Sequence, residues 1–516
     1  MKSNPINIRK AIHPSSKVIL SITFTVLFTI FLSSPVFADY GRSLPGYWPQ
    51  TEIYEELQLR GEIPLNHNVW PPRTAEVSSA LSEIPEGERW SDELRYFLEN
   101  RIVPEDTFLF IAEPGTDGIL NNPRDPDDRF YGLLRLGGGM DLGRLEFFTT
   151  YMVNTRWARE ENYRGRQWEG FAGRPDQVYI AAGDENWGLA FGRDYISWGE
   201  GLVLGRGHDP FERLDYEFQF GPFDFRGFVG FLDSRVYYEW FSPDSGVKHI
   251  QNRYLSGHRL EYVSPHFTIA LYENIIYGGE YRNLEVVYAV PFYWFHAEQL
   301  NSGKNDNTII GGDLQLLFSP IRFSLDFMVD DIQVEAERQA DEEPPEIGLV
   351  LQLDLATSPF GKWTTFTARY EGITNRTYNQ TYPHNKYLLM DQPLGSELGN
   401  DVDRTSLSAR SYLSPLAIIG AELFYLRDGE GEISDEWTEP WMEMEGNYVE
   451  PFPSGIVEKT AGVILSWKGY IGDRANWKLE WEYGQKRDAD HVRGAEKDYW
   501  QLGLRAQYAF TPGITF

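Results

Sequence analysis

The most unusual stretch of the sequence is Trp187–Arg213, which gathers side chains that could bind a ligand. Gly-Arg and Arg-Gly pairs lie on both sides of the segment Trp198-Gly199-Glu200-Gly201. Tryptophan rings can stack on sugar rings, and an arginine guanidinium can bind a carboxylate through two hydrogen bonds. The stretch is therefore a candidate binding site for a sugar or uronic acid, formed by Arg193, Trp198, Glu200, Arg206, His208, Asp209 and Arg213.

The same stretch also permits a purely structural interpretation. Glycine often marks a bulge or bend in a strand, and Arg–Glu pairs can brace the interior of a barrel. His208, Asp209 and Glu212 lie within a single turn and are too few for a metal or general-base site. No G-x-S-x-G nucleophile elbow occurs in the sequence. We therefore predict no catalytic residues, no metal ligands and no enzymatic activity.

The elements that must position these residues are β-strands. From Trp500 to Phe510 apolar or small residues occupy every even position, while polar residues and glycine fill the odd positions before Tyr508. This period of two is typical of a strand with one apolar face, either in a membrane barrel or at the edge of a soluble sandwich. Similar segments recur from Phe130 onward, joined by alternating short turns and long polar loops. That alternation favours an outer-membrane barrel of about 18 antiparallel strands.

Composition agrees with a barrel and excludes several other classes. The chain contains no cysteine, which excludes disulfides and a lipoprotein anchor. Aromatic residues make up 15% of the chain, as expected where aromatic girdles mark the membrane interfaces. The net charge is −30, and loss of a leader with four basic residues and no acid gives −34 (−30 minus 4). Such a negative surface repels nucleic acid, so we expect no nucleic-acid partner.

The N-terminal region differs from the repeated strand pattern. Basic residues, the apolar run Val18–Leu32 and a small-residue site ending at Ala38 form the pattern of a secretion signal. The following region carries three short helical patterns, which begin near Ile53, Thr74 and Ser91. We therefore divide the chain into a signal peptide (1–38), a helical periplasmic lobe (39–125) and an outer-membrane β-barrel (126–516).

Two short segments resemble the Wzi family of capsule-assembly outer-membrane proteins. The first is Gly192-Arg193 followed by Trp198-Gly199-Glu200-Gly201, and the second is Gly61-Glu62-Ile63-Pro64 followed by Trp70-Pro71. The sequence departs from the family's doubled Trp and Pro at Ser197-Trp198 and Glu200. It also departs from the family's Asn-Ala turn at His208-Asp209-Pro210. The resemblance therefore supports transfer of the fold more than transfer of the ligand.

The resemblance implies an all-β transmembrane barrel with a small N-terminal α-helical periplasmic lobe, located in the cell outer membrane. It also implies a lectin-like, non-catalytic protein that binds capsular or other surface polysaccharide and helps attach or assemble the capsule. The remaining expected partners are outer-membrane lipid and the outer-membrane assembly machinery, the latter through the C-terminal strand.

No cofactor is expected, although Ca²⁺ held by acidic loops could bridge this acidic chain to an anionic polysaccharide. The alternative function is an outer-membrane porin or substrate-specific channel, which would require an open lumen. A third possibility, an outer-membrane hydrolase, has little support in the sequence because no catalytic set can be assembled from it.

Overall fold

The computed structural model describes residues 50–82, 84, 107–121, 129–142, 145–159, 163, 165–184, 186–238, 248–331, 339–414, 416–443, 448–471 and 474–515. The predicted signal peptide and the helical pattern near Ser91 lie outside these ranges.

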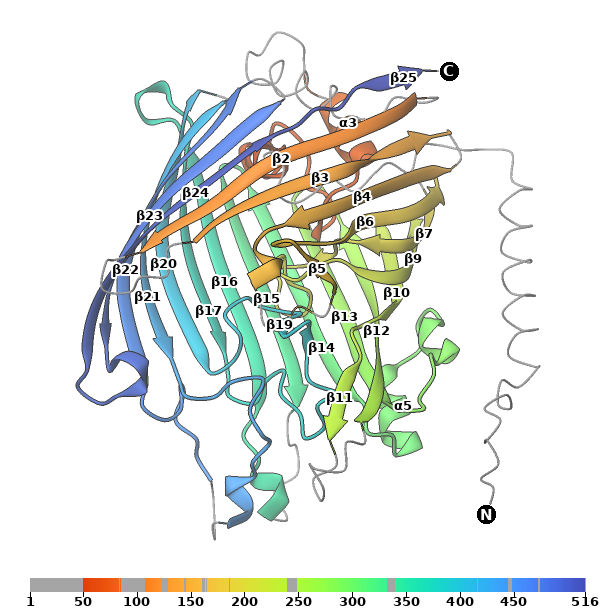
Figure 1. Cartoon of the computed structure of the whole chain (residues 1–516), viewed down its shortest axis with the longest axis vertical. Helices are drawn as coiled ribbons and strands as arrows, with labels where there is room; N and C mark the ends of the chain where they lie inside the picture. Colours follow the sequence, from red (N-terminus) through yellow and green to blue (C-terminus); the bar gives the residue numbers. More distant parts are fainter. Residues whose placement is uncertain are drawn as a thin grey trace.

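Eighteen antiparallel strands close into a barrel, as Figure 1 shows. Each strand pairs with the next along the chain, and the ring closes where the last strand pairs with the first. The strands are β2 (Thr107–Asn121), β3 (Arg129–Asp141), β4 (Glu146–Asn154), β6 (Phe171–Gly183), β7 (Trp187–Asp194), β9 (Phe211–Phe220), β10 (Phe223–Phe231), β12 (Lys248–Val263), β13 (Phe267–Glu280), β14 (Asn307–Phe318), β15 (Ile321–Asp331), β16 (Glu346–Thr357), β17 (Thr364–Ile373), β20 (Val402–Ser414), β21 (Ala417–Asp428), β22 (Glu458–Ile471), β23 (Ala475–Arg487) and β24 (Glu496–Tyr508). Three short strands extend the sheet: β5 (Gln167–Trp168), β11 (Arg235–Tyr238) and β25 (Gly513–Thr515).

The predicted closing strand is β24, and both of its edges are paired. Its residues bond β23 on one side, and on the other side Gln507 lies opposite Gly115 of β2. β25 continues the seam, with Ile514 opposite Phe108. A soluble edge strand would leave one edge free, so the barrel interpretation is confirmed.

The barrel begins earlier in the chain than the sequence predicts. β2 starts at Thr107, inside the range 39–125 that we predicted as the helical lobe, so the predicted boundary lies too far along the chain. The alternation of side chains in β2 is interrupted by Pro114, Gly115 and Gly118, which read as strand breakers. Pairing with β3 and β24 on both sides holds this segment extended despite those residues.

Side chains alternate between the lumen and the outer surface along each strand. On β13, for example, Tyr272 faces the lumen and bonds Asp326, while Leu271 points outward and is exposed. Exposed outward side chains on other strands are also apolar, as at Leu353, Leu407 and Leu423. None of the described helices is long and apolar enough to cross a membrane.

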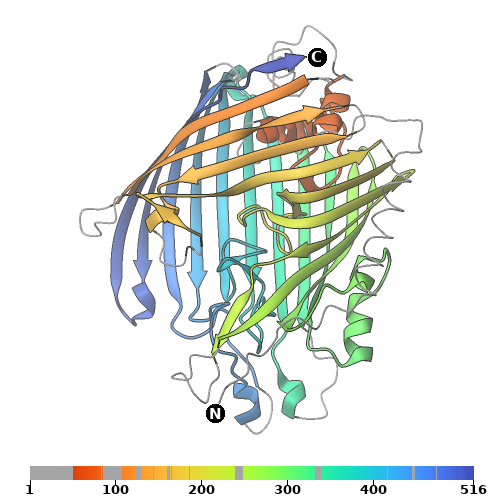
Figure 2. The same cartoon turned by 45° about the vertical axis from the view of Figure 1, so that its right-hand side comes forward.

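The N-terminal lobe lies inside the barrel opening, at the end where the strands are joined by short turns (Figure 2). It contains α2 (Gln50–Arg60), β1 (Val69–Trp70) and α3 (Thr74–Ser82), and the first helix ends at Gly61 with a positive φ of 74°. The two helices bury an apolar stripe against the inner barrel wall at Tyr412, Ile418 and Tyr470. The lobe therefore fills one end of the lumen.

Candidate functional site

The predicted binding stretch folds into the lumen. After β7, the chain turns inward and forms the short strand β8 (Ser197–Trp198), which pairs with β1 of the N-terminal lobe. Gly199 makes this turn possible, because its φ is +60° and an added Cβ would lie 2.7 Å from a carboxylate oxygen of Asp326. The stretch between β7 and β9 is therefore part of the barrel's interior.

A second long connection, between β17 and β20, also folds inward. It carries the short strands β18 (Leu388–Leu389) and β19 (Gln392–Pro393). The two inserted loops meet where the Gly205 amide donates to the Leu394 carbonyl at 2.8 Å and where the Tyr378 hydroxyl donates to the Leu202 carbonyl.

Both loops contribute to one apolar cluster inside the barrel. Leu202, Val203 and Leu204 are fully buried there, together with Tyr378, Tyr387 and inward-facing wall residues such as Leu255 and Ile309. Burial of apolar side chains is favourable, so the cluster stabilises both loops in the lumen. A water-filled passage at this level would have to displace the cluster.

Three of the seven predicted ligand-binding residues are buried structural residues. Trp198 is 1% exposed, and its ring packs against Phe228 with centroids 5.5 Å apart. Each ring nitrogen of His208 contacts a backbone carbonyl. The Arg213 Nε donates to Asp215 at 2.7 Å, and its other nitrogens donate to the backbone carbonyls of Asp194 and Tyr195, where β7 ends and the inserted loop begins.

The other four predicted residues form ion pairs, and two of them line a cavity. Arg193 pairs with Glu212, and Asp209 pairs with Arg174. Glu200 pairs with Arg369 and Arg206 pairs with Glu55, and both Glu200 and Arg206 line a chamber inside the barrel. Of the seven predicted residues, Glu200 and Arg206 therefore line the luminal chamber and the other five do not.

The luminal chamber has a volume of about 510 Å³ and lies between α2, the segment 66–72, the two inserted loops and the strands β14 to β21. Several of its charged side chains are paired: Arg369 contacts Glu200 at 2.8 Å, and Arg404 contacts Glu422 at 2.7 Å. The remaining lining groups are mainly amides and hydroxyls, among them Gln58, Asn66, Gln315, Gln352, Thr367, Ser406 and Ser408.

Two aromatic residues, Tyr54 and Trp70, line the luminal chamber, and Trp70 lies beside a cation. Trp70 of β1 lines the chamber, and the Arg206 guanidinium carbon lies 5.2 Å from its ring centroid. Arg206 also contacts Glu55 of α2 at 3.0 Å. An aromatic ring, an exposed guanidinium and several hydroxyl and amide groups can together hydrogen-bond and stack on a polyhydroxy ligand.

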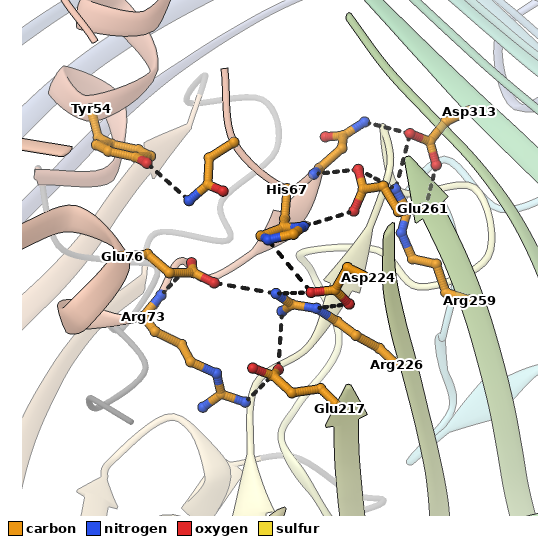
Figure 3. Close-up of polar contacts among 12 residues, drawn as sticks. Tyr54, His67, Arg73, Glu76, Glu217, Asp224, Arg226, Arg259, Glu261 and Asp313 are labelled. Carbon is orange, nitrogen blue, oxygen red and sulfur yellow. Dashed lines mark hydrogen bonds and ion pairs between the residues drawn. The ribbon is translucent and has the colours of Figure 1, made fainter. Parts of the chain in front are cut away.

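A network of ion pairs, shown in Figure 3, fastens the N-terminal wall of the luminal chamber to the barrel. Arg226 of β10 contacts Asp224 at 3.1 Å and Glu76 of α3 at 3.2 Å. Glu217 of β9 contacts both Arg226 and Arg73. The network joins the N-terminal lobe to the neighbouring strands β9 and β10, which are distant from the lobe in sequence, and no sequence pattern singled out its members.

A second cluster lies beside the first. Arg259 of β12 is fully buried and bonds both Asp313 of β14 and Glu261. Asn68 completes the cluster, since its backbone amide donates to Glu261 and its side-chain amide donates to Asp313, each at 2.8 Å. The lobe is therefore attached to the wall by hydrogen bonds from Asn68 to buried carboxylates that pair with Arg259.

His67 joins the two clusters, with its ring nitrogens 3.5 Å from Asp224 and 3.5 Å from Glu261 (Figure 3). Burial lowers the pKa of His67, but the two carboxylates outweigh burial and the net pKa is raised. A pKa above the ordinary value of about 6.5 means that protonation stabilises the folded protein.

The contribution of His67 to stability is expected to be complete below about pH 6.5 and to be lost as pH rises through the raised folded-state pKa. The difference in unfolding free energy between the parent protein and His67→Gln should therefore be larger at pH 6 than at pH 9. Urea unfolding of both proteins at the two pH values measures this. A difference that stays constant or grows with pH would contradict a charged His67.

Among the described residues, no group of three or more His, Asp or Glu side chains is placed to hold a metal ion.

The strand number and the occupied lumen define the class: an outer-membrane-type β-barrel whose interior is filled by its own loops and N-terminal lobe. The chain is similar to Wzi of Escherichia coli, described as an outer-membrane protein involved in group 1 capsule assembly and as a carbohydrate-binding β-barrel. The similarity covers 92% of this chain and 99% of Wzi, with a TM-score of 0.60 and 15% identity.

Two proteins of Pseudomonas aeruginosa are less similar. The similarity to OccD3 (OpdP) covers 78% of this chain and 91% of the OccD3 chain, with a TM-score of 0.45 and 11% identity. The similarity to OprD covers 80% of this chain and 95% of the OprD chain, with a TM-score of 0.44 and 10% identity. No family model and no curated protein match the sequence. At 15% identity the likeness to Wzi concerns the fold, and it confirms the architecture that the sequence resemblance implied.

Proposed function

We propose that this protein binds a surface polysaccharide in the outer membrane and helps attach or assemble a capsule, without catalysing a reaction. The observation that carries the proposal is the filled lumen, in which an apolar cluster of inserted loops lies beside a polar chamber. Wzi, whose fold is similar over 92% of this chain, is described as carbohydrate-binding.

The size and chemistry of the luminal chamber support a saccharide ligand. Its volume of about 510 Å³ is within the range of roughly 300–1,000 Å³ that is usual for small-molecule pockets. Amide and hydroxyl groups can satisfy sugar hydroxyls, and Trp70 supplies an aromatic ring. We assign the luminal chamber to a terminal or short internal piece of the polysaccharide.

The charge of the luminal chamber favours a neutral saccharide. Arg369, Arg404 and Arg206 each pair with a glutamate, so their positive charges are already balanced. The chain as a whole carries a net charge of −30, which repels a polyanion at long range. Ca²⁺ bridging through acidic loops is the alternative route by which an anionic polysaccharide could bind.

Glycan binding by the purified full-length barrel tests the proposal. Arg206→Ala and Glu200→Gln are each expected to weaken binding of the recognised glycan by about tenfold, the effect of losing one or two charge-assisted hydrogen bonds. Arg505→Ala is the matched control, because Arg505 pairs with Asp117 on β2 and does not line the luminal chamber. Unchanged binding by both chamber variants would exclude the chamber as the site, and the absence of any glycan ligand would overturn the function.

Two further measurements separate the alternatives. Addition of a chelator should leave binding of a neutral glycan unchanged and should abolish binding that depends on Ca²⁺ bridging. In planar bilayers the barrel is expected to show no steady conductance, because the apolar cluster of inserted loops occupies the lumen. Steady conductance would instead support the porin or substrate-specific channel.

We also propose membrane lipid and the outer-membrane assembly machinery as partners, the latter through the C-terminal strand.

A further inference from the structure

The connection between β13 and β14, residues 281–306, lies on the outside of the barrel. It contains the single turn η3 (Val286–Ala289) and the helix α5 (Phe295–Ser302). Figures 1 and 2 both show this green segment against the outer wall instead of in the lumen. The contacts agree with this placement. Phe295 of the segment packs on His258 of β12. The next residue, Arg259, and Tyr272 of β13 bond carboxylates in the lumen, so His258 must face outward because side chains alternate along a strand.

The segment reaches well down the wall. The Glu273 carboxylate accepts the backbone amides of Phe295 at 2.9 Å and His296 at 2.7 Å, at the N-terminus of α5. Glu273 lies seven residues before the end of β13 at Glu280 (280 minus 273). A strand rises ~3.3 Å per residue, so the contact lies roughly 20 Å along β13 from the loop end. Phe292 reaches Phe225 of β10, with ring centroids 4.3 Å apart.

The outer wall beneath the segment carries the apolar and aromatic side chains Tyr254, Ile275 and Tyr277, which pack against Tyr288 and Phe295 of the segment. At the level of Glu273 the covered wall also carries polar side chains. Glu273 is buried under α5 and is 3.3 Å from His258, and Thr308 bonds Gln299 of α5 at 2.6 Å. Ile310, which lies directly opposite Glu273 on β14, is outward and exposed, as is Leu271. At the level of Glu273 the wall is therefore apolar where it is bare, and it holds buried polar groups where the segment covers it.

The outer face of the segment restores an apolar surface. Trp294 is 72% exposed and Leu300 is 71% exposed, and Val286, Val290 and Phe292 are exposed as well. Arg282, Glu285 and Lys304 lie nearer the strand ends in sequence and pair with one another: Arg282 contacts Glu285 at 2.7 Å, and Lys304 contacts Glu285 at 2.6 Å. Glu298 of α5 is 3.5 Å from the same Lys304. The segment is thus charged near the loop end of the barrel and apolar farther down the wall.

We propose that residues 281–306 are embedded in the outer membrane, where their exposed apolar side chains contact lipid acyl chains. The exposed side chains continue the lipid-facing surface formed by Leu271 and Ile310. Water would make exposure of several large apolar side chains unfavourable, whereas acyl chains would bury them. The paired charges at the loop end suit the polar membrane interface. Glu273 is shielded from lipid because α5 caps it.

Spin labels on single cysteines test this placement in the full-length barrel reconstituted into phosphatidylcholine vesicles. The chain contains no cysteine, so each variant carries one label. The test positions are Trp294→Cys and Leu300→Cys. Leu271→Cys is the lipid-facing reference, and Val449→Cys, exposed in the connection between β21 and β22, is the water-facing reference.

Collision rates with oxygen, which concentrates in lipid, and with a water-soluble nickel complex give the result. Labels at both test positions are expected to match the Leu271 reference, with an oxygen-to-nickel ratio at least about threefold above the Val449 reference. Ratios equal to those at Val449 would place the segment in water and overturn the proposal. Protection from both reagents would indicate a protein partner on this face and would also overturn it.

Discussion

Replacing Arg259 with methionine is expected to lower the free energy of unfolding by roughly 3–5 kcal/mol. Arg259 is fully buried, and its guanidinium bonds Asp313 and Glu261. Removing it leaves two buried carboxylates without their shared cation, and both carboxylates also hold Asn68 of the N-terminal lobe. The loss should therefore loosen the lobe as well as the wall. Urea unfolding of the refolded barrel, followed by tryptophan fluorescence, measures the change.

Two companion variants identify the cause of this effect. Arg505→Met removes an exposed ion pair with Asp117 and should cost less than about 1 kcal/mol. Adding Asp313→Asn to Arg259→Met removes one of the stranded charges and should recover part of the stability. Equal losses in the two arginine variants would contradict the importance of burial.

Trp198→Ala is expected to destabilise the protein by roughly 3–5 kcal/mol, the usual cost of truncating a large buried aromatic side chain. Trp198 is 1% exposed and packs between the inserted loop and the wall residues Phe228 and Tyr272. The same truncation at Trp168, which is exposed on β5, should change stability by only about 0.5 kcal/mol.

The result bears on ligand binding as well as on folding. Trp198 is buried in the apolar cluster of inserted loops, so its truncation should reduce glycan binding only through loss of that cluster's packing. Arg206→Ala should do the reverse, with weaker binding and little change in stability, because the Arg206 side chain lines the luminal chamber and is exposed. A Trp198→Ala protein of normal stability that no longer binds glycan would show that Trp198 contacts the ligand directly.

The sequence by itself determined the architecture. The two-residue period of β24 and the alternation of short and long connections reflect constraints on each strand separately, since a membrane barrel needs one apolar face per strand. The helices α2 and α3 were likewise visible from local patterns, with Gly61 as the end of the first. The start of β2 was missed, because Pro114 and Gly115 are held in the barrel by neighbouring strands that a local pattern does not contain.

Only the tertiary structure shows which residues of the stretch Trp187–Arg213 line the luminal chamber. Trp, Arg and Gly in Trp187–Arg213 suit either a ligand surface or a packed interior, and the choice depends on what the fold brings against them. The stretch is held inside the lumen by contacts with three distant parts of the chain, at Val69, Asp326 and Leu394. Burial depends on contacts between distant parts of the chain, so spacing along the sequence could not predict which side chains would be buried. Trp198 is buried in the apolar cluster of inserted loops, whereas Arg206 lines the luminal chamber.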